Sequence, residues 1–128
     1  MIVLDASALL ALLQQEEGAE VVTQALANPQ GALISSVNHA EVVARLSDWG
    51  VPLGAVQEAL SALPLQVVAF DEALSYRSGQ LRPLTRAKGL SLGDRACLAL
   101  AQREGITALT ADRSWQALVP EVTLAWVR

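Results

Sequence analysis

Short apolar runs and amphipathic segments alternate along the chain. Buried strands are predicted where continuous or β-branched apolar residues are bounded by turn residues, at 2–5, 32–35, 65–70, 106–109 and 122–127. Helices are predicted where apolar residues recur with helical spacing, at 6–15, 19–27, 36–49, 53–62, 71–84 and 92–104, with a helical turn at 114–118. Because parallel strands need long crossover connections, this alternation favours an α/β fold with a mostly parallel sheet flanked by helices.

The length and composition restrict the class of protein. The chain has 128 residues, which fits one domain spanning 1–128, and no repeat or linker divides it. No apolar stretch approaches the roughly 18 residues that a membrane span needs, so we expect a cytoplasmic protein without membrane contact. The single cysteine, Cys97, lies among alanines and leucines, and we expect it to be a buried, unreactive thiol.

Four carboxylates follow or flank the predicted strands. Asp5 and Asp112 each come at or just after the end of a buried strand, while Glu41 and Asp94 lie near the starts of two helices. In an open α/β sheet, strand carboxyl ends and helix amino ends meet at one edge, which is the usual ligand crevice. Carboxylates gathered there repel one another, and a hard divalent cation such as Mg²⁺ or Mn²⁺ relieves that repulsion.

Each of these acids also has an ordinary structural explanation. Asp5 and Asp112 are typical helix N-caps, Glu41 fits the edge of an amphipathic helix, and the spacing from Ser91 to Asp94 approximates a capping box. Taken singly, none of the four demands a functional role. Taken in order along one sheet edge, they predict a single metal site.

Three smaller residues accompany the acids. Ser7 and Thr110 lie two residues from Asp5 and Asp112, where their hydroxyls would orient a carboxylate or bind a metal-bound water. Gly93 in the first turn of a helix costs helix stability, which indicates that another group approaches the backbone there. A substrate phosphate is one candidate, because helix amino ends bind anions.

The distribution of charge is uneven although the net charge is −4. Residues 1–44 contain no Lys or Arg, whereas 73–103 contain six of the nine basic residues and a single acid, Asp94. This segment is either a solvated helix face or a cationic surface for a polyanion. The residues that would contact RNA in the second case are Arg77, Arg82, Arg86, Lys88 and Arg95.

With these residues in view, the sequence resembles the PIN-domain ribonucleases, and most closely the toxins of VapBC-type toxin–antitoxin pairs. The resemblance rests on Asp5-Ala6-Ser7, Asn38-His39-Ala40-Glu41, Leu92-Gly93-Asp94 and Thr110-Ala111-Asp112. These motifs occur in the family's order and cover essentially the whole chain. One departure is Arg95, which follows the third acid where the family commonly has a small or apolar residue.

The resemblance implies a three-layer fold with a central sheet of four to five strands. It further implies a metal-dependent endoribonuclease in which the four acids hold one or two Mg²⁺ or Mn²⁺ ions and RNA is cut to 5′-phosphate and 3′-hydroxyl ends. The implied partners are the RNA substrate, a small cognate antitoxin and a second copy of the chain in a homodimer.

Several other classes of protein fit the sequence less well. Haloacid-dehalogenase phosphatases need a second Asp where this chain has Ser7, and receiver domains need two acids after the first strand and a functional lysine. P-loop and Rossmann proteins need a glycine-rich loop that is missing after the first strand. A PIN-domain nuclease of housekeeping RNA processing and a non-catalytic PIN-like binding module remain alternatives.

Overall fold

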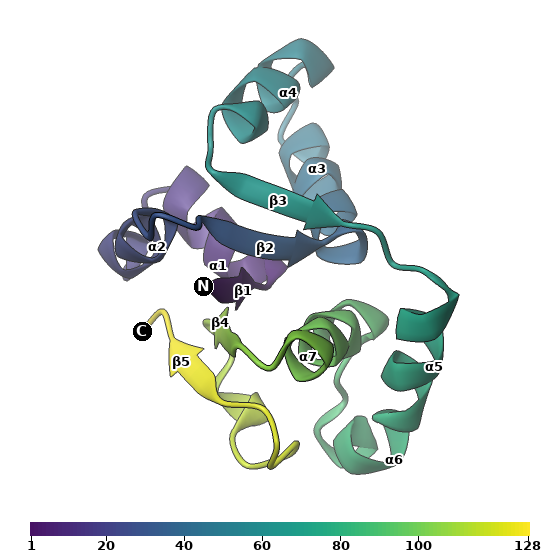
Figure 1. The fold of residues 1–128 in the computed structure, drawn as a ribbon. Coiled ribbons are helices and arrows are strands. Elements are labelled where there is room, and N and C mark those ends of the chain that lie inside the picture. The colour runs from purple at the N-terminus through teal and green to yellow at the C-terminus, as the bar shows by residue number, and fades with distance from the viewer.

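The computed structural model describes residues 1–128 and contains one fully parallel five-stranded sheet with the strand order β3-β2-β1-β4-β5 (Figure 1). The strands are β1 (Ile2–Leu4), β2 (Ala32–Ser35), β3 (Leu65–Val68), β4 (Thr107–Thr110) and β5 (Leu124–Trp126). The helices are α1 (Ala6–Leu13), α2 (Ala19–Leu26), α3 (Ser36–Asp48), α4 (Leu53–Ser61), α5 (Glu72–Gln80), α6 (Arg82–Thr85) and α7 (Leu92–Glu104), with 3₁₀ turns η1 (Arg86–Lys88) and η2 (Arg113–Trp115). The expected α/β class and parallel sheet are confirmed.

Helices cover both faces of the sheet, because the central strands alternate their side chains between two apolar layers. Val3 and Ala108 pack in a cluster with α5 and α7 on one face. Leu4 and Leu109 point the other way, toward α1 and α2, while Ile34 packs against α3 and α4. Residues on both faces of β1 are therefore fully buried, which explains its continuous apolar sequence.

The register of β1 places polar residues side by side at the carboxyl edge of the sheet. Leu4 is opposite Ile34 of β2 and Leu109 of β4. The next residue, Asp5, donates its amide to the Leu109 carbonyl at 3.2 Å and so lies beside Thr110. One short strand thereby fixes the position of the first acid against the end of β4.

The segment after β3 departs most from the sequence prediction. A single helix was expected over 71–84, but α5 stops at Gln80 and α6 restarts at Arg82. Pro83 has no amide to donate to a carbonyl of the preceding turn, which accounts for the break. The expected loop after this helix is a 3₁₀ turn that ends at Gly89 with φ of 66°. None of the helices is both long and apolar enough to cross a lipid bilayer.

Candidate metal centre at the carboxyl edge of the sheet

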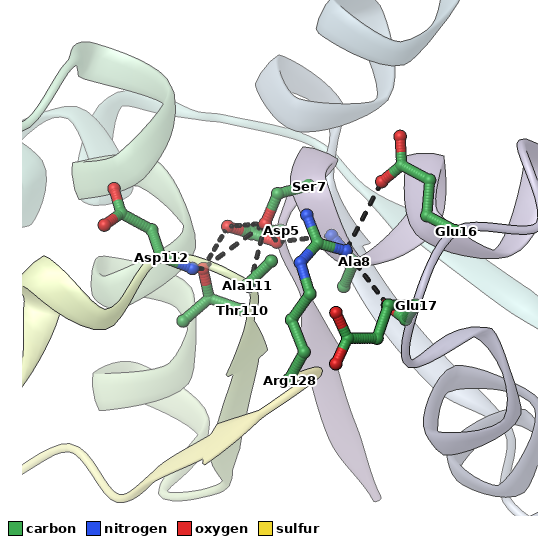
Figure 2. A network of polar contacts seen from close by, with 9 residues as sticks. All are labelled: Asp5, Ser7, Ala8, Glu16, Glu17, Thr110, Ala111, Asp112 and Arg128. Carbon is green, nitrogen blue, oxygen red and sulfur yellow. Dashed lines mark hydrogen bonds and ion pairs between the residues drawn. The ribbon is translucent and has the colours of Figure 1, made fainter.

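Asp5 is a buried carboxylate held by hydrogen bonds from three directions (Figure 2). Its Oδ1 accepts from the Ala8 amide at 2.8 Å, so it caps α1 as the sequence predicts. The Ser7 hydroxyl donates to the same oxygen at 2.7 Å, and the Thr110 hydroxyl donates to Oδ2 at 2.6 Å. Only 4% of the residue is exposed. Asp5 therefore has a fixed orientation imposed by both β1 and β4.

Burial raises the pKa of Asp5 from its ordinary value of 3.8 to about 6, although the hydrogen bonds from Thr110, Ala8 and Ser7 pull in the opposite direction. The negative charge of Asp94 adds to the increase. None of the three ion pairs in the structure includes Asp5 or the other three predicted acids. Ionisation of Asp5 is therefore unfavourable in the folded chain, and a bound cation would stabilise its charged form.

Ser7 and Thr110 connect the loops on either side of Asp5. The Ser7 oxygen accepts from the Ala111 amide at 3.0 Å, and the Thr110 oxygen accepts from the Asp112 amide at 3.0 Å. Each hydroxyl therefore donates to Asp5 while accepting from the segment that carries Asp112. The two residues predicted to support the site are placed where they orient Asp5.

Glu41 is placed by a contact between α3 and α7. Asn38, one turn earlier in α3, donates from Nδ2 to Glu41 Oε1 at 3.0 Å and to the Gly93 carbonyl at 2.9 Å. A β-carbon at residue 93 would overlap the Glu41 carboxylate. The group that approaches the Gly93 backbone is therefore Glu41, where the sequence had suggested a substrate phosphate. Burial raises the pKa of Glu41, the bond from Asn38 lowers it and the charge of Asp94 raises it.

Asp94 and Asp112 both take part in helix caps. Asp94 Oδ2 accepts from the Ser91 amide at 2.9 Å while the Ser91 hydroxyl accepts from the Asp94 amide, which completes a capping box. Asp112 Oδ1 accepts from the Ser114 amide at 2.9 Å and caps η2. The capping roles predicted for Asp94 and Asp112 are thus confirmed. Each carboxylate keeps its second oxygen free of hydrogen bonds.

All four acids line one hollow of about 330 Å³ at this edge of the sheet. Two arginines, Arg45 and Arg128, also line it. As the side chains lie, no three acidic, histidine or cysteine side chains are arranged around a common ion position. The donor set nevertheless suits a hydrated divalent cation, because Mg²⁺ prefers oxygen ligands and usually binds through one or two carboxylates while keeping several waters. The raised pKa values of Asp5 and Glu41 support this assignment, because they show charged forms that a nearby cation would stabilise.

Cys97 lies beneath the site without taking part in it. The residue is fully buried in the core against the sheet. Burial raises the pKa of its thiol, and the nearby charges of Asp5, Asp94 and Glu41 act in the same direction. The thiol is therefore held in its protonated form, as expected for an unreactive cysteine.

The predicted basic segment does not line the hollow that the four acids share. Its five residues lie on α5, α6, η1 and α7, and none of them lines the hollow. Arg77 donates to Gln102 Oε1 at 3.3 Å, and Arg95 donates to the Ser78 carbonyl at 3.2 Å, which ties α7 to α5. Their proposed contact with RNA stays a prediction.

Sequence reasoning missed the two arginines that do line the hollow. Arg45 follows Glu41 by four residues on the same helix, so helical spacing alone places it on the same face. Arg128 follows β5, and only the parallel pairing of β5 with β4 brings it to the acidic edge. No local pattern in the sequence marks Arg128.

Comparisons with known proteins agree with this architecture. The sequence model of the PIN domain family matches residues 2–119. A toxin–antitoxin complex from Klebsiella pneumoniae contains a similar chain, with a TM-score of 0.76, 22% identity and 96% of each chain covered. The structure of VapBC2 from Rickettsia felis, bound to a DNA fragment from its promoter, matches with a TM-score of 0.75 and 19% identity, with 98% of each chain covered. Mycobacterium tuberculosis VapC20, a sarcin–ricin loop cleaving toxin, matches with a TM-score of 0.72 and 19% identity, covering 91% of this chain and 94% of VapC20. No curated protein gives a significant match.

Proposed function

The chain belongs to the PIN domain family, and on that premise we propose that it is a Mg²⁺- or Mn²⁺-dependent endoribonuclease. The observation that carries the proposal is the shared hollow lined by Asp5, Glu41, Asp94 and Asp112. Two of these carboxylates have raised pKa values, and none is paired with a cation. Ionised Asp5 and Glu41 in particular are costly to a fold that does not use them.

In this proposal the four acids hold the metal, and the surrounding residues keep them in position. When bound, the metal supplies Lewis acidity, which lowers the pKa of water and offsets charge on the scissile phosphate. Ser7 and Thr110 orient Asp5 through their hydroxyls, and Asn38 orients Glu41 through its amide. These contacts hold the site before substrate arrives, which avoids reorganisation during the reaction.

The chemistry is an in-line hydrolysis of a phosphodiester. A water oxygen attacks phosphorus, the bond to the 3′ oxygen breaks, and the electron pair leaves with that oxygen. The attacking water loses a proton to a carboxylate, and the 3′ oxygen gains one from solvent. The acceptor would be a carboxylate that keeps an oxygen free of the metal. The products are a 5′-phosphate and a 3′-hydroxyl.

A cleavage assay tests this function directly. The purified chain is incubated with a labelled RNA in Mg²⁺, in Mn²⁺ and in EDTA, beside the Asp5→Asn variant. We expect cleavage only with the metals and only by the parent chain, with 5′-phosphate ends at the cut. Cleavage that continues in EDTA or in the variant would refute the metal site. Binding of RNA without any cleavage would favour a non-catalytic module.

We further propose that the protein is the cytoplasmic toxin of a VapBC-type pair and is held inactive by a small antitoxin. Its likeness to chains of toxin–antitoxin complexes over nearly the whole length supports this role. A second, mostly apolar groove of about 520 Å³ lies between α3, α4 and β3. Leu53 and Val67 line it and are 63% and 45% exposed, so a partner that covers them would bury apolar surface.

Expression in a bacterial host tests the toxin role. We expect growth arrest by the parent chain, rescue by a small protein encoded beside it, and no arrest by Asp5→Asn. Light scattering on the purified chain tests the proposed homodimer. Unimpaired growth despite RNA cleavage in vitro would instead favour a nuclease of housekeeping RNA processing.

A further inference from the structure

One stripe of α3 leads out of the acidic hollow to an exposed aromatic ring. Glu41, Arg45 and Trp49 follow one another at four-residue intervals, which places them on the same side of the helix. Glu41 and Arg45 line the hollow. The Arg45 guanidinium lies over the Trp49 ring at 6.0 Å, and Trp49 is 47% exposed. The stripe thus presents an acid, a cation and an aromatic face in that order.

Arg128 brings a second cation to the hollow from the opposite side of the sheet edge. Figure 2 shows its side chain reaching from the end of β5 toward the loop after α1. Its Nη1 donates to the Glu17 carbonyl at 3.0 Å and lies 3.4 Å from Glu16 Oε1. Its own carbonyl accepts from Arg113 Nε at 2.9 Å. These contacts fix Arg128 at the hollow, where it pairs with Glu16 and with none of the four predicted acids.

The backbone on both sides of this contact is tightly packed. Gly18 adopts φ of 91°, and a β-carbon there would overlap Val127, so the end of β5 lies directly on the loop between α1 and α2. Arg113 in turn stacks on Trp126 of β5 at 4.8 Å. The position of Arg128 is therefore set by the packing of β5.

A single-stranded nucleic acid is bound by cations that contact its phosphates and by aromatic rings on which its unpaired bases stack. Both groups occur here. Arg45 and Arg128 line the hollow with the acids, and Trp49, which contacts Arg45, lies about 12 Å along the helix axis from Glu41. Arg45 makes no ion pair in the structure, so its charge is available to a phosphate. A protein partner would use the ring but would have no need of two arginines beside a metal site.

We propose that Arg45, Arg128 and Trp49 form the substrate track of this nuclease and hold an RNA strand beside the four acids. The two arginines contact the phosphates next to the scissile bond, and Trp49 stacks on a nearby base. This inference rests on the proposed function. It differs from the sequence-based expectation, which assigned RNA contacts to the basic segment of α5, α6, η1 and α7.

Fluorescence anisotropy with an unstructured, labelled RNA oligonucleotide tests the proposal in the Asp5→Asn background, which allows binding without cleavage. We expect Arg45→Gln and Arg128→Gln each to weaken binding about fivefold and to reduce the slope of log affinity against log salt by about 0.7. Trp49→Leu is expected to weaken binding about tenfold with an unchanged slope. RNA should also quench tryptophan fluorescence in the parent and fail to do so in Trp49→Leu.

Matched controls remove a charge or a ring elsewhere. Arg103→Gln removes an arginine on α7 that pairs with Asp71, and Tyr76→Leu removes a ring that is 68% exposed on α5. Neither should change RNA affinity more than twofold. If Asp5→Asn does not fold, the same titrations are made in the parent background in EDTA.

Two results would overturn the inference while leaving the proposed function intact. In the first, the parent chain cleaves RNA, yet the track variants bind it as well as the controls do. In the second, Trp49→Leu changes the oligomeric state and leaves RNA affinity unchanged, which would assign the ring to a protein interface. If the parent chain neither binds nor cleaves RNA, the proposed function and the inference fail together.

Discussion

Two pairs of carboxylates meet at the edge of this sheet, and the fold treats them differently. Asp94 and Asp112 stabilise helices, because each accepts a hydrogen bond from a backbone amide in a cap. Asp5 also caps a helix, but it is buried to 4% exposure and its pKa is raised to about 6. Glu41 caps nothing and lies against the Gly93 backbone with a raised pKa.

The difference separates two roles that an acid can have at this edge of the sheet, which are helix capping and metal binding. A cap explains Asp94 and Asp112 even if the protein binds no metal, so those residues alone are weak support for a site. Asp5 and Glu41 are in environments that oppose their ionisation, so helix capping alone does not account for them. The case for a metal centre therefore rests chiefly on this second pair.

Asp5→Asn should produce the largest effect and should separate activity from stability. We expect RNA cleavage to fall by more than about 100-fold, since even outer-shell changes at metal sites cost 10–100-fold. The amide oxygen can still cap α1, and loss of the buried charge adds about 3 kcal/mol at about pH 7. The Thr110 hydroxyl loses its acceptor at a cost of about 1 kcal/mol, so the free energy of unfolding should rise by about 2 kcal/mol. Denaturant unfolding measures this change. A variant that is both inactive and less stable would show that the ionised Asp5 does not destabilise the fold.

The pH dependence of stability should reveal the same buried charge. The folded chain binds the Asp5 proton more tightly than the unfolded chain does, because the pKa rises from 3.8 to about 6 on folding. The free energy of unfolding should therefore fall by about 3 kcal/mol as the pH rises between these two values, and then level off. The difference between the parent and Asp5→Asn in metal-free buffer isolates this effect. A difference that is flat with pH would show that Asp5 is not buried as described.

Gly93→Ala should displace Glu41 while leaving the helix intact. The new methyl group would overlap the Glu41 carboxylate, and we expect about tenfold lower cleavage from a misplaced ligand. Gly54→Ala is the matched control, because Gly54 is also the second residue of a helix and its added β-carbon meets no atom within 4 Å. The control should gain about 0.5–1 kcal/mol and Gly93→Ala clearly less. Equal stability gains and full activity in both would remove Glu41 from the site.

The smallest stability effect is expected for Asp112→Asn, because the capping role and the metal-binding role of this residue can be separated. Asp112→Ala should lose about 1 kcal/mol with the cap of η2, whereas Asp112→Asn should keep most of it because asparagine is an equally good cap. Both variants should lose cleavage activity. Thermal unfolding and the RNA assay compare them side by side. An active Asp112→Asn variant would show that the residue is a cap and nothing more.

Sequence patterns predicted the strands and helices well where local signals agreed with the fold. The bounds of β2 and α7 match the prediction, because apolar runs there end at clear capping residues. The break between α5 and α6 was missed, since the helical pattern continues through Leu81 while Pro83 interrupts the backbone hydrogen bonds. Short-range patterns therefore identify most elements and misjudge those that a single proline divides.

For the candidate site, strand ends and helix starts were enough to place four acids at one edge, as the shared hollow shows. The contact of Glu41 with Gly93 and the packing of Arg128 beside Asp5 join residues far apart in the chain, and no local spacing encodes them. The basic segment is compact in sequence but does not line the hollow. Its contact with RNA stays a prediction.

Calorimetric titration of Mn²⁺ into the metal-free chain tests the central claim most directly, because it measures the site without any substrate. We expect saturable binding at about pH 7, at least about tenfold weaker in Asp5→Asn. Measured in two buffers of different ionisation enthalpy, binding should release more protons as the pH is lowered toward 6, the pKa of Asp5. Equal affinity in the parent and Asp5→Asn, with no proton release, would contradict a metal centre built on these four acids.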